Sequence, residues 1–146
     1  MKISHLSKRA LSSLSQTPVS SLDVAMVREI LNAAEFQVWT EMQHRDQRHS
    51  IVVLRRFDSL LPTAVRAERA AALLHDVGKK VSDLGFLSRI VATVVGPRGQ
   101  RFADYHNHEK LGADLIQSIS DPRTVALVGG TVDDGVAMLL QAADDI

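Results

Sequence analysis

Histidine is the residue type that carries most of the chemical information in this sequence. The most informative stretch runs from Ala70 to Lys80, where a segment rich in alanine and leucine leads directly into His75 and Asp76. An adjacent imidazole and carboxylate can share one divalent cation. The pair therefore predicts a metal site at the end of a helix. Four of the six histidines lie at predicted element boundaries beside other polar residues, namely His49, His75, His106 and His108.

Together with the three residues that follow it, the His-Asp pair forms the motif HDVGK. Gly78 permits the chain to leave the helix sharply, which would free Lys79 to reach an anionic substrate beside the metal. Lys79 could also be a cation that interacts with the carbonyl end of a helix, but we favour a phosphate contact. A lone His-Asp dipeptide occurs by chance, whereas HDVGK at the end of an apolar helix is a more specific motif.

The absence of cysteine limits the chemistry of any metal site. With no thiolate available, a metal must be bound by His, Asp, Glu and water. These ligands suit Mn, Fe, Ni, Zn or Mg. We therefore expect one divalent metal ion as the cofactor.

Length and composition predict a single soluble domain. The chain has 146 residues, of which 45% are hydrophobic and 23% charged, and its formal net charge is zero. A zero net charge argues against nonspecific binding to nucleic acids or membranes. The longest apolar runs have four or five residues, far short of the roughly 20 that a membrane span needs. We expect a flexible tail over residues 1–20, a domain over residues 21–146, and a cytoplasmic location.

The elements that must position these side chains are predicted to be helices. Apolar residues recur at helical spacing, and no segment shows sustained period-two alternation. The pattern predicts an all-α fold, a single compact bundle of about six or seven helices. Pro62 is expected to end the helix that contains His49, with Ile51, Val52, Leu54, Phe57 and Leu61 on its inner face. Helical spacing runs through residues 22–34, 36–42, 43–61, 64–74, 84–95, 108–119, 122–128 and 132–146.

The motif and its helical setting resemble the HD superfamily of metal-dependent phosphohydrolases, which is named for a ligand pattern of H…HD…D. The resemblance covers Arg48 to Asp145, about two thirds of the chain. It implies that the first ligand is His49, on a helix before the HD helix. It also implies that the last ligand is Asp144 on the final helix. Asp145 is the alternative, because neighbours on a helix point about 100° apart and only one can face the metal.

The resemblance also bears on the number of metal ions. In two-metal relatives, the histidine that corresponds to His108 binds a second metal. Such relatives usually supply a further histidine before the last helix, but residues 125–136 contain none. A second metal is therefore not expected unless Asp133 or Asp134 substitutes, and we predict that His108 contacts the substrate.

The activity implied by the resemblance is hydrolysis of a phosphomonoester or phosphodiester, with a nucleotide as the expected substrate. Asp76 would ligate the metal and help to take the proton from the attacking water. Lys79 would hold the phosphate, together with Arg48 or an arginine of the segment Arg98–Arg101. We therefore expect a hydrolase that acts on ester bonds.

Three other functions fit the sequence less well than this one. A non-catalytic sensor or partner-binding module on the same scaffold would not need to retain every type of ligand. A two-metal cyclic-nucleotide phosphodiesterase is disfavoured by the missing histidine. A (p)ppGpp hydrolase fits poorly, because acidic residues follow the His-Asp pair in such enzymes, whereas Gly78 and Lys79 lie near it here.

Overall fold

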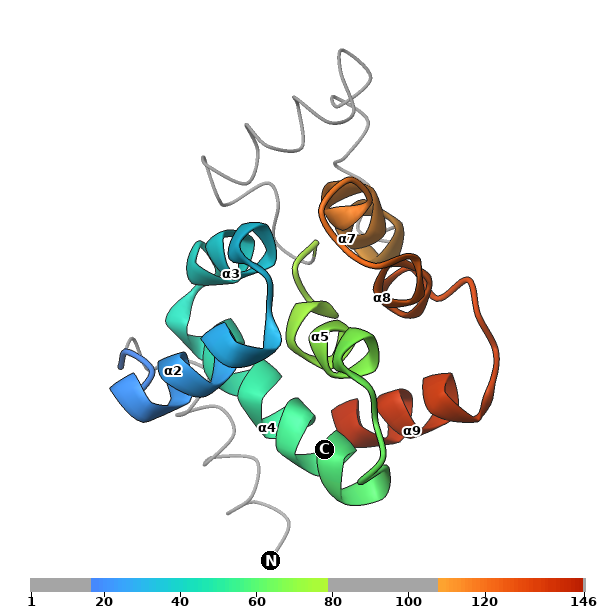
Figure 1. Cartoon of the computed structure of the whole chain (residues 1–146), viewed down its shortest axis with the longest axis horizontal. Helices are drawn as coiled ribbons and strands as arrows, with labels where there is room; N and C mark the ends of the chain where they lie inside the picture. Colours follow the sequence, from blue (N-terminus) through green and yellow to red (C-terminus); the bar gives the residue numbers. More distant parts are fainter. Residues whose placement is uncertain (1–16, 79–107, 146) are drawn as a thin grey trace, which may run out of the picture.

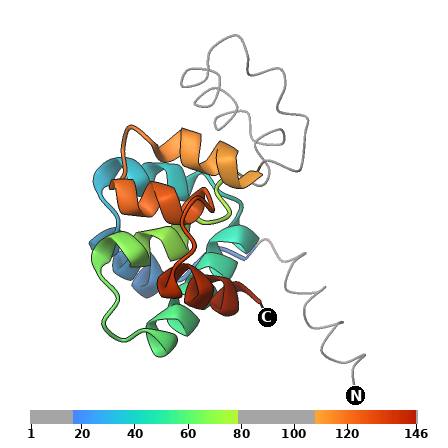
Figure 2. The ribbon, with the colours of Figure 1, turned by 90° about the vertical axis from the view of Figure 1, so that its right-hand side faces the viewer.

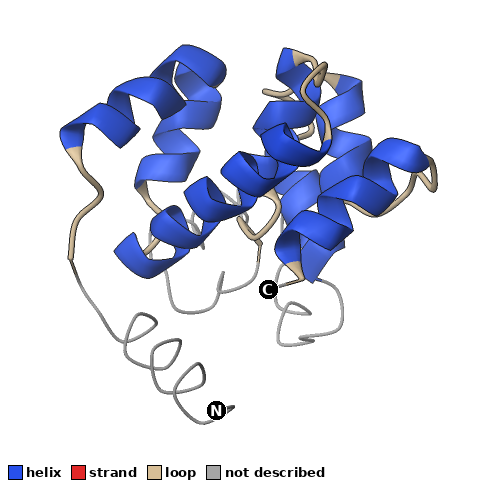
Figure 3. Cartoon of the chain, turned by 90° about the horizontal axis from the view of Figure 1, so that it is seen from below, coloured by secondary structure: helices blue, strands red, loops and turns tan. Residues whose placement is uncertain are grey.

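The computed structural model of the chain describes residues 17–78 and 108–145, and in these residues every regular element is a helix (Figures 1 and 3). The predicted all-α bundle is confirmed for this part of the chain. The predicted helix over residues 84–95 lies outside it, as does the predicted tail except for residues 17–20. The helices are α2 (Ser21–Ile30), α3 (Ala33–Thr40), α4 (His44–Leu60), α5 (Arg66–Leu74), α7 (His108–Ile116), α8 (Pro122–Val128) and α9 (Gly135–Asp144).

The short helix α5 lies at the centre of the bundle (Figure 1). It contacts α4 and α8 most extensively, and it also contacts α2 and α3. A helix covered on several sides must be apolar around much of its circumference. This explains why residues 70–74, Ala-Ala-Ala-Leu-Leu, are all fully buried. The alanines allow neighbouring helices to approach the one that leads to the His-Asp pair.

The longest helix, α4, supports both α5 and α9. Its inner face contributes Ile51, Leu54 and Phe57 to the core, as predicted. Val52 was placed on this face as well, and that prediction is wrong: its side chain is 43% exposed. Successive helical residues are about 100° apart, so four consecutive apolar residues cannot all face the core.

Local polar residues set the boundaries of several helices. Ser20 caps α2, and Asn32 caps α3 by accepting from the backbone N–H of Glu35, whose carboxylate accepts from the backbone N–H of Asn32. This capping box separates α2 from α3 inside the predicted helical segment 22–34. Asp121 caps α8 directly before Pro122, so this helix has the predicted bounds of 122–128.

The last helix begins three residues later than predicted. Gly130 has a φ of 65°, a left-handed conformation that favours glycine, and it turns the chain after α8. The carboxylate of Asp134 then accepts from the backbone N–H of Ala137 and starts α9 at Gly135. Figure 2 shows α9 and α4 side by side, in agreement with their extensive contact. None of the described helices is both long and apolar enough to cross a membrane.

Candidate metal centre

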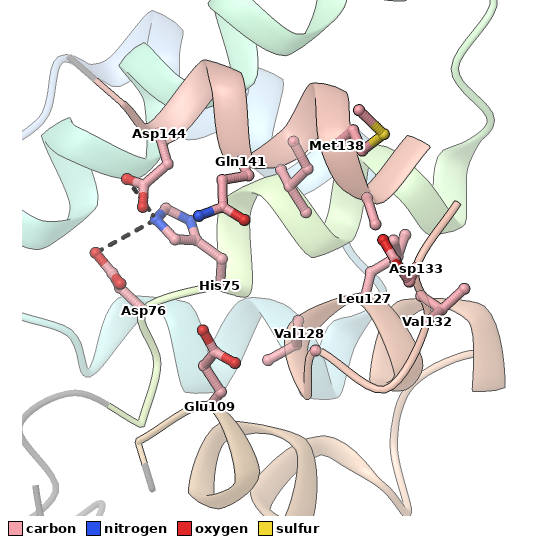
Figure 4. Close-up of a pocket in the computed structure, with 13 residues that line it drawn as sticks. His75, Asp76, Glu109, Leu127, Val128, Val132, Asp133, Met138, Gln141 and Asp144 are labelled. Carbon is pink, nitrogen blue, oxygen red and sulfur yellow. Dashed lines mark hydrogen bonds and ion pairs between the residues drawn. The ribbon is translucent and has the colours of Figure 1, made fainter. Parts of the chain in front are cut away.

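Three helices deliver four potential ligands to one point. His49 lies in the first half of α4, His75 and Asp76 follow the last residue of α5, and Asp144 is the last residue of α9. One ligand atom from each of these residues lies within 4.8 Å of the others. Figure 4 shows the side chains of His75, Asp76 and Asp144 turned toward one another. The structure thus brings together the four residues that were predicted from the sequence to be ligands.

The distances within this group fit a divalent cation. His49 Nε2 is 2.9 Å from Asp144 Oδ1 and 3.8 Å from Asp76 Oδ2. His75 Nε2 is 3.2 Å from Asp144 Oδ1 and 3.3 Å from Asp76 Oδ2. A cation with bonds of about 2.0–2.2 Å has neighbouring ligand atoms roughly 3–3.5 Å apart. Two imidazoles and two carboxylates with these separations could therefore hold one ion with little rearrangement.

The backbone of α5 fixes which nitrogen of His75 is available. Its Nδ1 lies 2.7 Å from the carbonyl oxygen of Ala72. A carbonyl can only accept a hydrogen bond, so Nδ1 carries a proton and Nε2 faces Asp76 and Asp144. Metal-binding histidines are commonly held in this way by their second nitrogen.

The electrostatics of the group without a cation are those of a tight ion pair. Burial lowers the pKa of His75, but the hydrogen bonds that its imidazole donates to the carboxylates of Asp144 and Asp76 outweigh this effect and raise the pKa to about 10. The hydrogen bond from His75 holds the pKa of Asp144 well below its usual range. Without a cation, the protonated imidazole of His75 therefore supplies the positive charge that faces the two carboxylates.

Asp144, rather than Asp145, belongs to the group. Asp145 is the C-cap residue after α9, and its backbone oxygen accepts a hydrogen bond from the guanidinium of Arg56 at 3.3 Å. The same guanidinium donates to the carbonyl oxygen of Ala142 at 3.3 Å. Arg56 on α4 thus binds the carbonyl end of α9 beside Asp144 and helps to set its position.

A pocket of about 470 Å³ adjoins the four-residue group (Figure 4). It includes His75, Asp76 and Asp144 at one end. The remainder is formed by the first turn of α7, the end of α8, the loop before α9 and one face of α9. The other lining residues are Glu109, Leu127, Val128, Gly130, Val132, Asp133, Ala137, Met138, Leu140 and Gln141. A volume of this size can hold a small organic molecule next to a bound ion.

The structure does not bring every predicted residue to this pocket. The guanidinium of Arg48 donates to the backbone oxygen of Thr17, and Arg48 is not among the described lining residues. Lys79 and the segment Arg98–Arg101 lie outside the described residues. His108 is the first residue of α7, and its substrate contact stays a prediction.

The two aspartates considered as substitutes for a second metal ligand differ in their surroundings. Asp133 lines the pocket, away from the four-residue group (Figure 4). Asp134 pairs with Arg123 at 2.7 Å and caps α9. Neither belongs to the candidate metal group found among the described residues.

Sequence reasoning missed Glu109 and Gln141, both of which line the pocket. Gln141 lies three residues before Asp144 on α9, so a helical model would have placed the two on one face. Glu109 directly follows His108, which the resemblance to the HD superfamily had already brought into consideration. No comparable motif in the sequence marks the apolar part of the pocket.

Comparisons with protein-family models, curated proteins and solved structures found no match to this chain.

Proposed function

We propose that this chain is a metal-dependent phosphohydrolase that cleaves the phosphomonoester or phosphodiester bond of a small organic phosphate such as a nucleotide. The observation that carries the proposal is the convergence of His49, His75, Asp76 and Asp144 at one end of a pocket. The HDVGK motif and its resemblance to the HD superfamily support the same conclusion.

The chemistry follows from the types of ligand. A divalent cation held by two imidazoles and two carboxylates supplies Lewis acidity, which lowers the pKa of water and offsets charge on a phosphoryl group. Asp76, whose side chain is only 8% exposed, would orient the attacking water and accept its proton. Lys79, three residues after Asp76, would hold a phosphate oxygen.

The acidic ligands also explain why the site would act on a phosphate only when a divalent cation is bound. Without a cation, the protonated His75 offsets only one of the two carboxylates of Asp76 and Asp144, so the group presents a net negative charge to an incoming phosphate. With a divalent cation, the two carboxylates and the ion sum to about zero charge, so an anionic substrate can approach. Phosphate binding should therefore depend on metal as strongly as hydrolysis does.

The test is a metal titration followed by a substrate screen on the full chain. Purified protein is stripped with EDTA, loaded in turn with Mn, Fe, Ni, Zn or Mg, and assayed for phosphate release from nucleotides. We expect one ion per chain and hydrolysis that disappears with EDTA. The matched variants are Asp144→Asn, which should lose both properties, and Asp145→Asn, which should keep both.

The same experiment separates the enzyme from a non-catalytic module on this scaffold. A module of that kind would bind one ion, or none, and release no phosphate from any compound in the screen. Metal binding without turnover across all five ions would reject the proposed hydrolase.

A further inference from the structure

Most of the side chains that line the far part of the pocket are apolar, in contrast to the metal centre. Figure 4 shows the ligand group at one end, Leu127, Val132 and Asp133 toward the other, and Val128 between them. The side chains of Leu127 and Val128 are almost fully buried, so they form a fixed wall. A phosphate at the metal would therefore carry its organic part along an apolar surface.

Met138 on α9 forms part of the opposite wall. Its side chain lines the pocket and is 68% exposed, one of the few large apolar side chains in the described chain that remain open to solvent. A flexible thioether suits contact with a planar or irregular organic group. Binding of such a group would cover this exposed apolar surface.

Among the described residues, the charges along the pocket are acidic. Apart from the candidate ligands, the ionisable residues that line it are Glu109 and Asp133, and no lysine or arginine lines it among the described residues. One phosphate would be offset by the bound cation under the proposed function. A second or third phosphate, extending along the pocket, would meet carboxylates instead, and unpaired like charges are strongly unfavourable.

We infer that the pocket selects an organic phosphate with a single phosphate group, whose apolar body lies against Leu127, Val128 and Met138. A hydrogen-bond donor on that body would meet the carboxylate of Asp133, and polyphosphates would be rejected. This inference rests on the proposed function and assigns its substrate class.

The first test compares substrates that share one organic body. The full chain loaded with Mn²⁺ is assayed with adenosine 5′-monophosphate, diphosphate and triphosphate, and the binding of each is measured by calorimetry. We expect kcat/KM and affinity for the monophosphate to exceed those for the diphosphate by roughly tenfold or more. Equal or better use of the diphosphate or triphosphate would overturn the inference.

The second test alters the exposed wall of the pocket. Met138→Ala should raise KM for the monophosphate several-fold with little change in kcat, because it removes contact with the organic part alone. Inhibition by inorganic phosphate should be unchanged, since that ion has no organic part. The matched control is Leu22→Ala, which truncates an 82% exposed apolar side chain outside the pocket and should alter neither value. An unchanged KM in Met138→Ala would contradict the assignment.

The third test removes one of the acidic charges. Asp133→Asn should narrow the preference for monophosphate over diphosphate by a few-fold, because less repulsion opposes the additional phosphate. Glu41→Gln removes the same charge from an exposed residue outside the pocket and should leave the preference as it is. A preference that Asp133→Asn does not change would count against the electrostatic argument.

Failure of this inference and failure of the proposed function are distinguishable. Cleavage of mono- and diphosphates at equal rates would leave a hydrolase without this selectivity. A chain that cleaves none of them, yet binds the monophosphate more tightly than the diphosphate and loses affinity in Met138→Ala, would keep the pocket assignment and lose the hydrolase.

Discussion

At the residue scale, Asp144 and His75 are both candidate metal ligands and, without a metal, partners in an ion pair. Their carboxylate and imidazole lie 3.2 Å apart, and each stabilises the charged form of the other. A bound cation would replace the proton of His75 as the positive partner of both carboxylates. Metal binding and protonation of His75 therefore compete for the same nitrogen atom, Nε2.

The metal-free protein should lose stability as the pH rises from about 6.5 toward 10. The pKa of His75 is raised from its ordinary 6.5 to about 10 in the folded chain, so its contribution is complete below 6.5 and is lost as the pH passes through 10. The contribution of Asp144 has the opposite dependence, because its pKa is lowered and stability is lost only in acid.

Urea denaturation in EDTA at about pH 6 and about pH 9.5 measures this difference. The Asp144→Asn variant is the control, because it removes the strongest partner that raises the pKa of His75. Its stability should fall less over the same interval. An equal fall in the two proteins would mean that another group titrates.

Asp76 and Lys79 should respond to mutation in different ways. Asp76→Ala should abolish metal binding and reduce hydrolysis by orders of magnitude, because the Lewis acid itself is lost. Lys79→Ala should keep the metal and lower kcat/KM by roughly tenfold, since one charged contact to phosphate is lost. Metal analysis and steady-state kinetics on both variants provide the comparison. Unchanged kinetics in Lys79→Ala would mean that Lys79 does not contact the phosphate and instead interacts with the carbonyl end of a helix.

At the element scale, the sequence predicted the helices better than it predicted the faces they present. The cap at Asp121 and Pro122 and the break at Gly130 have local causes, so they could be recognised from a few neighbouring residues. The orientation of Val52 depends on which turn of α4 meets the core, and that is set by packing. The choice between Asp144 and Asp145 depends on one helical step of about 100°, which only the docking of α9 on α4 decides.

The pocket could not be predicted because the residues that line it are scattered along the chain. Its lining combines Glu109 of α7, Val128 of α8 and Met138 of α9 with the residues that follow α5. These side chains share one space only after the helices have packed. The ligand group was accessible to sequence reasoning because its motif and the resemblance that it carries name particular residues, whereas an apolar wall has no such motif.

Ser50 should stabilise the contact between α3 and α4 without contributing to the metal site. Its hydroxyl accepts a hydrogen bond from the buried Nε1 of Trp39 at 3.0 Å, and it is fully buried beside His49 in sequence. Ser50→Ala would leave that N–H without its acceptor, so we expect a loss of about 1–3 kcal/mol in the free energy of unfolding. Urea denaturation measures the loss, and the metal stoichiometry should remain one.

The matched control for Ser50→Ala is Ser59→Ala. The hydroxyl of Ser59 donates to the backbone of Arg55 on the exposed side of the same helix. This change should alter stability by less than about 0.5 kcal/mol. A loss of metal in Ser50→Ala would instead show that the contact between α3 and α4 controls the position of His49.

At the scale of the whole molecule, the candidate ligands join parts of the chain that are distant in sequence. His49 and His75 belong to the central pair α4 and α5, whereas Asp144 lies at the end of the described chain on α9. The helix α9 packs mainly on α4, so an ion bound between them would add a second connection for the last helix. Metal binding should therefore stabilise the entire fold as well as the site.

Thermal unfolding with and without metal tests this expectation. An ion that binds the folded chain alone contributes about 2.7 kcal/mol when its free concentration is 100 times Kd, so Mn²⁺ should raise Tm by several degrees over the value in EDTA. Asp144→Asn should lose most of that shift, because α9 would no longer supply a charged ligand. Asp145→Asn should retain it, because Asp145 lies outside the ligand group. If the two variants shifted equally, the stabilising ion would be bound elsewhere, and α9 would owe its position to packing on α4 and to the contacts of Arg56 alone.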